Sequence, residues 1–185
     1  MKTLSLFLVF TFIAINSVMS QLYVGANIGN EHYSQTNSVF QHYSSIFEAI
    51  ELKYQIKKIN LCIDYNNISR VNNLDNDILE TQNNRFSFIV NYLQIQETQR
   101  FNLSTGFGIF ARLPYQSYSK MNINYGKYFN VGLTANIAVN FFIKSGNYFS
   151  LGYRFSKEFY NSQNNNSLMT NDYGFYFGIS TNFKK

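Results

Sequence analysis

The strongest constraint in this sequence is an alternation of apolar with polar or small residues that recurs along the chain. It is clearest over the last fourteen residues, 172–185, where every second side chain is apolar, aromatic or Thr. These side chains are Phe175, Phe177, Ile179, Thr181 and Phe183. A period of two is typical of a β-strand with two different faces. One face is too apolar for water and the other too polar for a dry core, which favours a wall between lipid and a hydrated lumen.

Eight segments share this alternation, and the connections between them alternate in length. The segments are 21–30, 46–56, 59–67, 85–95, 101–113, 127–143, 148–157 and 172–185. Long polar connections fall at 31–45, 68–84, 115–126 and 158–171, with short connections in between. Outer-membrane barrels have short turns on the periplasmic rim and longer loops on the outer rim. The sequence therefore predicts an all-β fold, an eight-stranded antiparallel up-and-down transmembrane β-barrel in which the last segment pairs with the first.

The alternation by itself also fits a soluble, lipocalin-like barrel with its apolar face inside. The glycines of the strands favour the membrane alternative, because they lie on the polar face together with several charged residues. A tight lumen accommodates small residues and paired charges, whereas a soluble exterior would carry many more Lys and Glu. The glycines concerned are Gly25, Gly29, Gly106, Gly108, Gly132, Gly152, Gly174 and Gly178.

Two strands contain irregular positions. In 85–95, Ile89, Leu93 and Ile95 have the opposite parity from Phe86, so we expect either a β-bulge or an apolar plug in the lumen. Pro114 follows the segment 101–113 and is expected to end that strand, because proline cannot donate to the ladder.

The N-terminal segment 1–20 has the plan of a secretory signal peptide. One positive charge precedes an apolar run over 4–15, and small residues lead to a cleavage site at about Ser20. A transmembrane helix is the alternative, but this apolar run is shorter than the about 20 residues that a spanning helix needs. The sequence therefore predicts a signal peptide over 1–20 and one outer-membrane barrel domain over 21–185.

The composition agrees with an exported membrane barrel. Charged residues make up 14% of the chain, and aromatic residues make up 18%. Such a charged fraction is low for a soluble surface. Cys62 is the single cysteine, so no intramolecular disulfide can form. The formal net charge of +5 is scattered without a basic run, which argues against a nucleic-acid partner.

Charged side chains on the polar face are the candidate lumen residues: Glu51, Lys53, Asp64, Arg112 and Arg154. We expect them to form an internal network of salt bridges and hydrogen bonds that fills the barrel. The alternative is the lining of a polar, porin-like pore. Eight strands enclose room only for side chains or one small ligand, which argues against a wide channel.

Four motifs resemble those of small outer-membrane barrels of the Bacteroidetes type, a group that includes PorT-like proteins and the similar OmpX- and OmpA-like eight-stranded barrels. They are the segments 91–95 (NYLQI), 102–110 (NLSTGFGIF), 150–154 (SLGYR) and 176–183. The group's first motif continues with Pro and apolar residues, whereas here the polar residues 96–99 follow. The resemblance implies the barrel fold and a location in the outer membrane of the cell envelope. The even number of strands and the long connections on one rim place both mature termini in the periplasm. The resemblance implies no particular activity.

The terminal strand also resembles the β-signal of barrel proteins, in which hydrophobic residues at alternate positions precede a terminal aromatic. Phe177, Ile179 and Thr181 match the alternate positions and Phe183 the terminal aromatic, although two lysines follow it. The resemblance implies the barrel-assembly machinery as a partner, besides outer-membrane lipid.

No motif for catalysis, cofactor binding or metal binding stands out. His32 and His42 lie in the first long connection, near Glu31 and Ser34, and nothing places a base within reach of a nucleophile. We therefore expect a non-enzymatic barrel with a structural or interaction role, presenting four extracellular loops to a surface or envelope protein partner. The alternatives are a barrel enzyme acting on lipid and a narrow pore or small-ligand-binding barrel.

Overall fold

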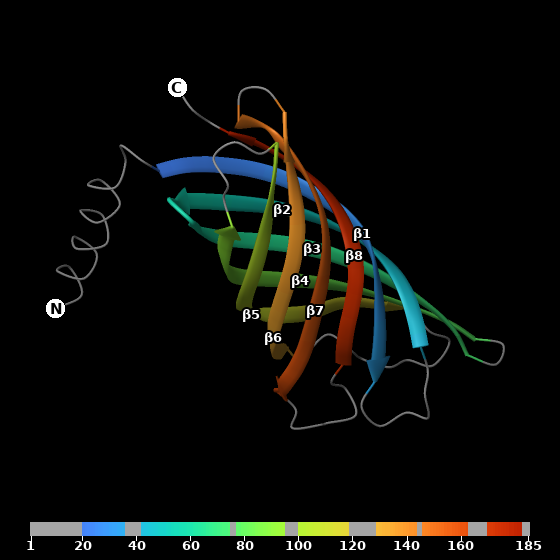
Figure 1. Cartoon of the computed structure of the whole chain (residues 1–185). Helices are drawn as coiled ribbons and strands as arrows, with labels where there is room; N and C mark the ends of the chain where they lie inside the picture. Colours follow the sequence, from blue (N-terminus) through green and yellow to red (C-terminus); the bar gives the residue numbers. More distant parts are fainter. Residues whose placement is uncertain are drawn as a thin grey trace, which may run out of the picture.

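The chain forms a closed barrel of eight antiparallel strands in simple up-and-down order (Figure 1). The computed structural model describes residues 20–35, 42–74, 77–94, 100–118, 129–143, 146–162 and 170–182. Its strands are β1 (Ser20–Gln35), β2 (His42–Ile56), β3 (Ile59–Leu74), β4 (Asp77–Gln94), β5 (Phe101–Tyr118), β6 (Asn130–Phe142), β7 (Tyr148–Asn161) and β8 (Thr170–Asn182). The ladder between β1 and β8 closes the barrel, from Tyr23 opposite Asn182 to Gln35 opposite Thr170. The predicted fold class is confirmed.

The barrel has two rims, and the start of the first strand and the end of the last strand lie at the same rim. We call this the turn rim: it contains Ser20, the turn at Lys57 and Lys58, the turn at Gly146, and Asn182. Lys57 (φ 52°) and Gly146 (φ 83°) adopt left-handed backbone conformations. Tight hairpins require such conformations in their turns. The opposite end, where the predicted long connections lie, is the loop rim.

The strands extend further toward the loop rim than the sequence pattern predicts. Much of the predicted connection 68–84 is strand, because β3 and β4 remain paired as far as Leu74 opposite Asp77. Likewise β1 reaches Gln35, β7 reaches Asn161 and β8 begins at Thr170. The prediction of loops at these positions was wrong. A ladder is held by backbone hydrogen bonds, so it continues where polar residues occupy both faces and the two-faced pattern is lost.

The apolar face of the wall is outside and the polar face is inside. Phe107 and Ile50 are 59% and 65% exposed, whereas Asp64 and Arg85 are fully buried. The soluble alternative required the opposite arrangement and is wrong. A small apolar cluster lies within the polar interior: Phe47, Ala49, Ile68, Ala138 and Tyr176.

The irregular residues of β4 form an apolar plug. Ile89 and Leu93 are 1% and 4% exposed inside the barrel, and pairing with β5 is regular from Asn83 to Gln94. The plug is therefore correct and the bulge alternative is wrong for these residues, while Ile95 lies outside the described residues. Pro114 does not end β5, which continues to Tyr118. It lies beside a register shift between Gln82 and Asn83, an irregularity that tolerates a residue without an N–H.

Glycines on the inner face provide room for large side chains from neighbouring strands. A Cβ at Gly152 would meet the ring of Tyr176, one at Gly29 the ring of Phe47, and one at Gly132 the ring of Phe110. These aromatic rings therefore lie directly over the glycines, in contact with the wall inside the barrel. Among the described residues, no helix is long and apolar enough to cross a membrane. The predicted signal peptide lies outside the described residues, apart from Ser20.

Candidate functional site

Charged side chains of the described interior form three groups. The group nearest the turn rim contains Glu51 and Lys53 of β2, which form an ion pair. The Glu51 carboxylate accepts hydrogen bonds from Asn27 Nδ2 (2.9 Å) and Ser180 Oγ (3.1 Å). The Lys53 ammonium lies 5.2 Å from the ring centroid of Tyr148, an aromatic side chain buried at the start of β7.

The middle group joins opposite walls of the barrel. Arg154 Nη2 of β7 lies 2.7 Å from Asp64 Oδ2 of β3, and Arg154 Nη1 donates to Asn66 Oδ1 at 3.3 Å. Asn66 Nδ2 donates in turn to Asp64 Oδ1 at 3.0 Å. The guanidinium lies between the rings of Phe47 and Tyr176, with centroids at 5.8 and 5.5 Å. Cation–π contacts therefore supplement the ion pair.

The third group, toward the loop rim, contains two arginines and three carboxylates. Arg112 forms ion pairs with Asp172 and with Glu158, the latter with an Nη1–Oε1 distance of 2.5 Å. Arg85 Nη1 lies 2.7 Å from Glu31 Oε1 and 3.9 Å from Asp172 Oδ2. Both guanidinium groups contact the ring of Phe110. The Cζ atoms of Arg85 and Arg112 lie 5.6 and 5.5 Å from the ring centroid.

All five predicted lumen residues lie inside the barrel and are buried. They are divided among three groups, since Glu51 pairs with Lys53, Asp64 pairs with Arg154, and Arg112 is bound to other partners. Four further charged residues of the described interior were missed: Glu31, Arg85, Glu158 and Asp172. Their positions in the alternation could have identified them. Glu31 and Glu158 continue the inward-facing alternate positions of β1 and β7, although the sequence pattern predicts polar connections there.

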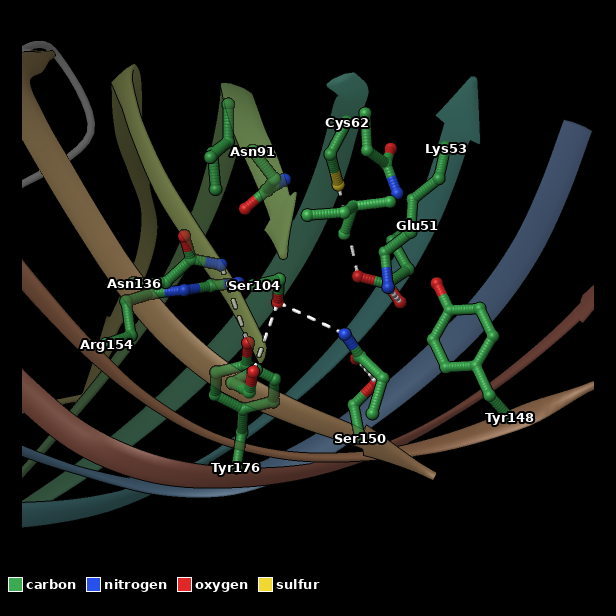
Figure 2. A pocket seen from close by; sticks show the side chains of 15 residues that line it. Glu51, Lys53, Cys62, Asn91, Ser104, Asn136, Tyr148, Ser150, Arg154 and Tyr176 are labelled. Carbon is green, nitrogen blue, oxygen red and sulfur yellow. Dashed lines mark hydrogen bonds and ion pairs between the residues drawn. The ribbon is translucent and has the colours of Figure 1, made fainter. Parts of the chain in front are cut away.

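Little empty space remains among these side chains. Figure 2 shows side chains from several strands converging on one small cavity between the turn-rim group and Arg154. Its volume is about 20 Å³. That is about enough for one water molecule. Asn102, Ser104, Asn140 and Ser150 fill the adjacent space through mutual hydrogen bonds of 2.7 to 3.2 Å. The described interior is therefore packed like a polar core.

Neither histidine is part of a described catalytic arrangement. The ring of His32 is half-buried and lies 5.6 Å from the ring of Tyr173, and the side chain of His42 lies outside the described residues. Within the described ranges, no group of three His, Cys, Asp or Glu side chains is placed to hold a metal ion. Cys62 is buried, and its Sγ lies 3.9 Å from a Glu51 carboxylate oxygen.

The outer wall forms a band of apolar side chains bounded by polar ones. Phe177, Ile179 and Thr181, the described part of the predicted assembly signal, are exposed on this wall, while Phe183 lies outside the described residues. On the described part of the wall, the strands carry two outward charges, Glu48 of β2 and Lys157 of β7.

Comparison of the structure with solved structures identifies the fold. Neisserial surface protein A superposes with a TM-score of 0.65 at 13% sequence identity, over 88% of this chain and 97% of that protein. This is the fold of the small outer-membrane β-barrels. A major outer membrane protein from Thermus thermophilus superposes with a TM-score of 0.62 at 9% identity, over 89% of this chain and 99% of that one.

A third outer-membrane barrel is similar to a lesser degree. Ail, the attachment invasion locus protein of Yersinia pestis, solved in complex with the heparin analogue sucrose octasulfate, has a TM-score of 0.54 at 8% identity. The match covers 89% of this chain and 99% of that one. No protein-family model matches the sequence, and no curated protein sequence matches it. The likeness therefore concerns the fold alone.

Proposed function

We propose that this chain is an integral outer-membrane protein with a non-enzymatic, structural or interaction role. The observation that carries the proposal is the polarity of the wall. Large apolar side chains such as Phe107, Ile137 and Phe175 are about half or more exposed outside, while nine charged side chains of the described residues are buried inside. The nine are Glu31, Glu51, Lys53, Asp64, Arg85, Arg112, Arg154, Glu158 and Asp172. Water would destabilise that exterior, whereas lipid solvates it.

The height of the apolar band supports this location. A polar residue ends the apolar outward stretch ten residues from the turn-rim end in β1 and β4, nine in β7 and eight in β2 and β3; in β4 the end residue Gln94 is also outward and polar. The residues that end the stretch are Asn30, Glu48, Asn67, Asn84 and Lys157. At about 3.4 Å per residue and a tilt of about 40°, this interval spans roughly 20–26 Å, close to the about 25 Å apolar band of outer-membrane barrels.

The packed interior favours a structural or interaction role over transport. The cavity among the described interior side chains holds only about 20 Å³, and the Arg154–Asp64 ion pair crosses the lumen, so both obstruct the passage of a solute there. The loop rim, where four connections leave the barrel, is then the candidate interaction surface. The chain presents these connections to a surface or envelope protein partner, because they are the parts of such a barrel that reach water outside the cell.

The orientation and origin belong to the same proposal. The signal peptide over 1–20 directs export, the barrel-assembly machinery inserts the barrel, and the turn rim with both mature termini faces the periplasm. The motifs shared with PorT-like proteins favour a Bacteroidetes-type envelope. The proposal involves no cofactor. Ser180 and Cys62 contact the Glu51 carboxylate, but all three are buried inside the barrel and away from lipid, which argues against lipid hydrolysis.

Membrane fractionation with a gel-shift assay tests this proposal. The full chain, expressed in a Gram-negative host, is expected in the outer-membrane fraction, and its band is expected to change mobility when the sample is boiled. Protease added to intact cells is expected to cut connections of the loop rim and to spare the turn at Lys57. Recovery in the soluble periplasm, or cleavage only after the outer membrane is opened, would overturn the location or the orientation.

A further inference from the structure

The outer wall carries an apolar groove across β1, β2, β3 and β8. Its volume is about 570 Å³. Ligand pockets in proteins range over roughly 300–1000 Å³, so the groove has the size of a ligand site. Ala26 forms its floor, because it is a small outward residue paired with Ile50 on one side and Ile179 on the other. Ile28 and Phe177, which are also paired, continue the groove toward the loop rim. A small side chain among large ones therefore hollows the wall.

One carboxylate lies at the polar end of this groove. Glu48 is exposed on the outer wall, in register with Ile28 of β1 and Asn67 of β3, and lines the groove with them. Among the described residues, Glu48 has no ion-pair or hydrogen-bond partner, whereas the buried carboxylates inside the barrel are paired. A carboxylate at this boundary costs little by itself, but without a partner on the protein it is available to a cationic or N–H group of a ligand.

The level of Glu48 indicates which part of a lipid it meets. It lies on the polar boundary of the apolar band, the same line as Asn67 and Lys157, while Ala26 and Ile179 lie toward the middle of the band. A ligand that follows the groove therefore has an apolar chain beside Ala26 and a polar group beside Glu48. The sign of the carboxylate requires that this group carry positive charge or N–H donors.

We propose that this groove binds a lipid of the outer leaflet that carries a primary ammonium group, because Glu48 lies toward the loop rim; phosphatidylethanolamine serves as the probe for this chemistry. The acyl chain lies over Ala26 between Ile50 and Ile179, and the ammonium donates to the Glu48 carboxylate. The groove would hold this lipid as a bound ligand in addition to the solvating lipid of the wall. The inference rests on the proposed membrane location.

The test measures lipid retention by the folded full-length barrel in nanodiscs that contain equal amounts of palmitoyl-oleoyl phosphatidylethanolamine and phosphatidylglycerol. Native mass spectrometry counts the lipids that stay bound to the barrel after the barrel is released from the nanodisc. The wild type is expected to retain the ethanolamine lipid about tenfold more than the glycerol lipid, the scale of one charge-assisted hydrogen bond. Glu48→Gln is expected to remove this preference, and Lys157→Gln to leave it unchanged.

A matched pair of substitutions tests the groove separately from the charge. Ala26→Phe fills the floor and is expected to abolish retention of the ethanolamine lipid. Ala135→Phe makes the same change on the outer wall of β6, away from the groove, and is expected to have no effect. Equal retention of the two lipids by the wild type, or a preference that survives Glu48→Gln or Ala26→Phe, would overturn the proposal.

Two further outcomes are distinguishable. A dimer that forms in the wild type and dissociates in Glu48→Gln, without retained lipid, would show a second copy of the chain in the groove and overturn the lipid proposal. Each variant is first checked for a heat-modifiable band. A wild type that forms no such band and does not enter nanodiscs would overturn the membrane location itself, whereas a folded barrel without lipid preference would overturn the groove alone.

Discussion

Arg154 and Asp64 join opposite walls of the barrel through an Nη2–Oδ2 contact of 2.7 Å. Their strands, β7 and β3, are four positions apart in a ring of eight, so the pair crosses the lumen. Both side chains are buried, and the rings of Phe47 and Tyr176 lie on the guanidinium. This ion pair braces the barrel from inside and contributes to closing it to solutes.

Breaking this pair is expected to destabilise the barrel strongly. Asp64→Asn leaves the Arg154 guanidinium buried without its counter-ion, and is expected to cost about 3–5 kcal/mol of unfolding free energy. Urea titration of barrels folded into vesicles measures the loss. The double variant Asp64→Val with Arg154→Met removes both charges and is expected to cost less than the sum of the two single changes. Strict additivity would show that the pair is not coupled.

The apolar plug of β4 makes a second prediction. Ile89 fills space inside the barrel. Ile89→Ala therefore creates a cavity and is expected to cost about 2–5 kcal/mol. Ile63→Ala, on the outer wall of the adjacent β3, is the matched control, because lipid can fill the space that it leaves. The control is expected to cost less in the same urea titration. Equal losses would argue that Ile89 does not pack in the interior.

Any side chain at position 152 is predicted to destabilise the barrel while Tyr176 is present. A Cβ there would overlap the Tyr176 ring. Gly152→Ala is therefore expected to lower stability by about 1–3 kcal/mol through overpacking. Combining it with Tyr176→Ala removes the overlap. The double variant is then expected to be no less stable than Tyr176→Ala alone in thermal unfolding, and a further loss would contradict the packing of this ring.

The assembly signal is tested by charge substitutions in the last strand. Phe177→Asp combined with Phe183→Asp is expected to prevent assembly in cells, since both residues match the pattern that the resemblance assigns to the β-signal. Phe107→Asp places the same charge on the outer wall of β5 and controls for the cost of a charge in lipid. The measurement is the heat-modifiable fraction in the outer membrane. Normal insertion of the double variant would count against the signal.

Sequence reasoning succeeded where one face of each strand meets lipid. There the apolar parity is strong, so the strand count and the division of residues between two faces follow from it. The glycines and charges indicated which face is inside, and the opposite parity of Ile89 and Leu93 allowed either a plug or a bulge. Near the loop rim both faces are polar, as at Asn72 and Asn73 of β3, and the parity signal disappears although the ladder continues. Ladder length was therefore underestimated, and Glu158 was assigned to a connection instead of the interior.

Pairing across the lumen could not be predicted for a related reason. Parity places Arg112 inside, but it does not determine which of the other strands supplies its counter-ion. Its partners Glu158 and Asp172 come from β7 and β8. This choice depends on the shear of the closed barrel. The groove over Ala26 likewise arises from registers across four strands, which no single segment contains.

The orientation of the wall is the central claim, and spin labels on outward residues test it most directly. Labels attached to Ile109→Cys, Ile137→Cys and Lys157→Cys, each in a Cys62→Ser background, report collisions with oxygen, which concentrates in lipid, and with a water-soluble nickel complex. Ile109 and Ile137 are predicted to show high oxygen and low nickel accessibility, and Lys157 an intermediate ratio at the membrane boundary. High nickel accessibility at Ile109 and Ile137 would show that water covers this face, and would contradict the account.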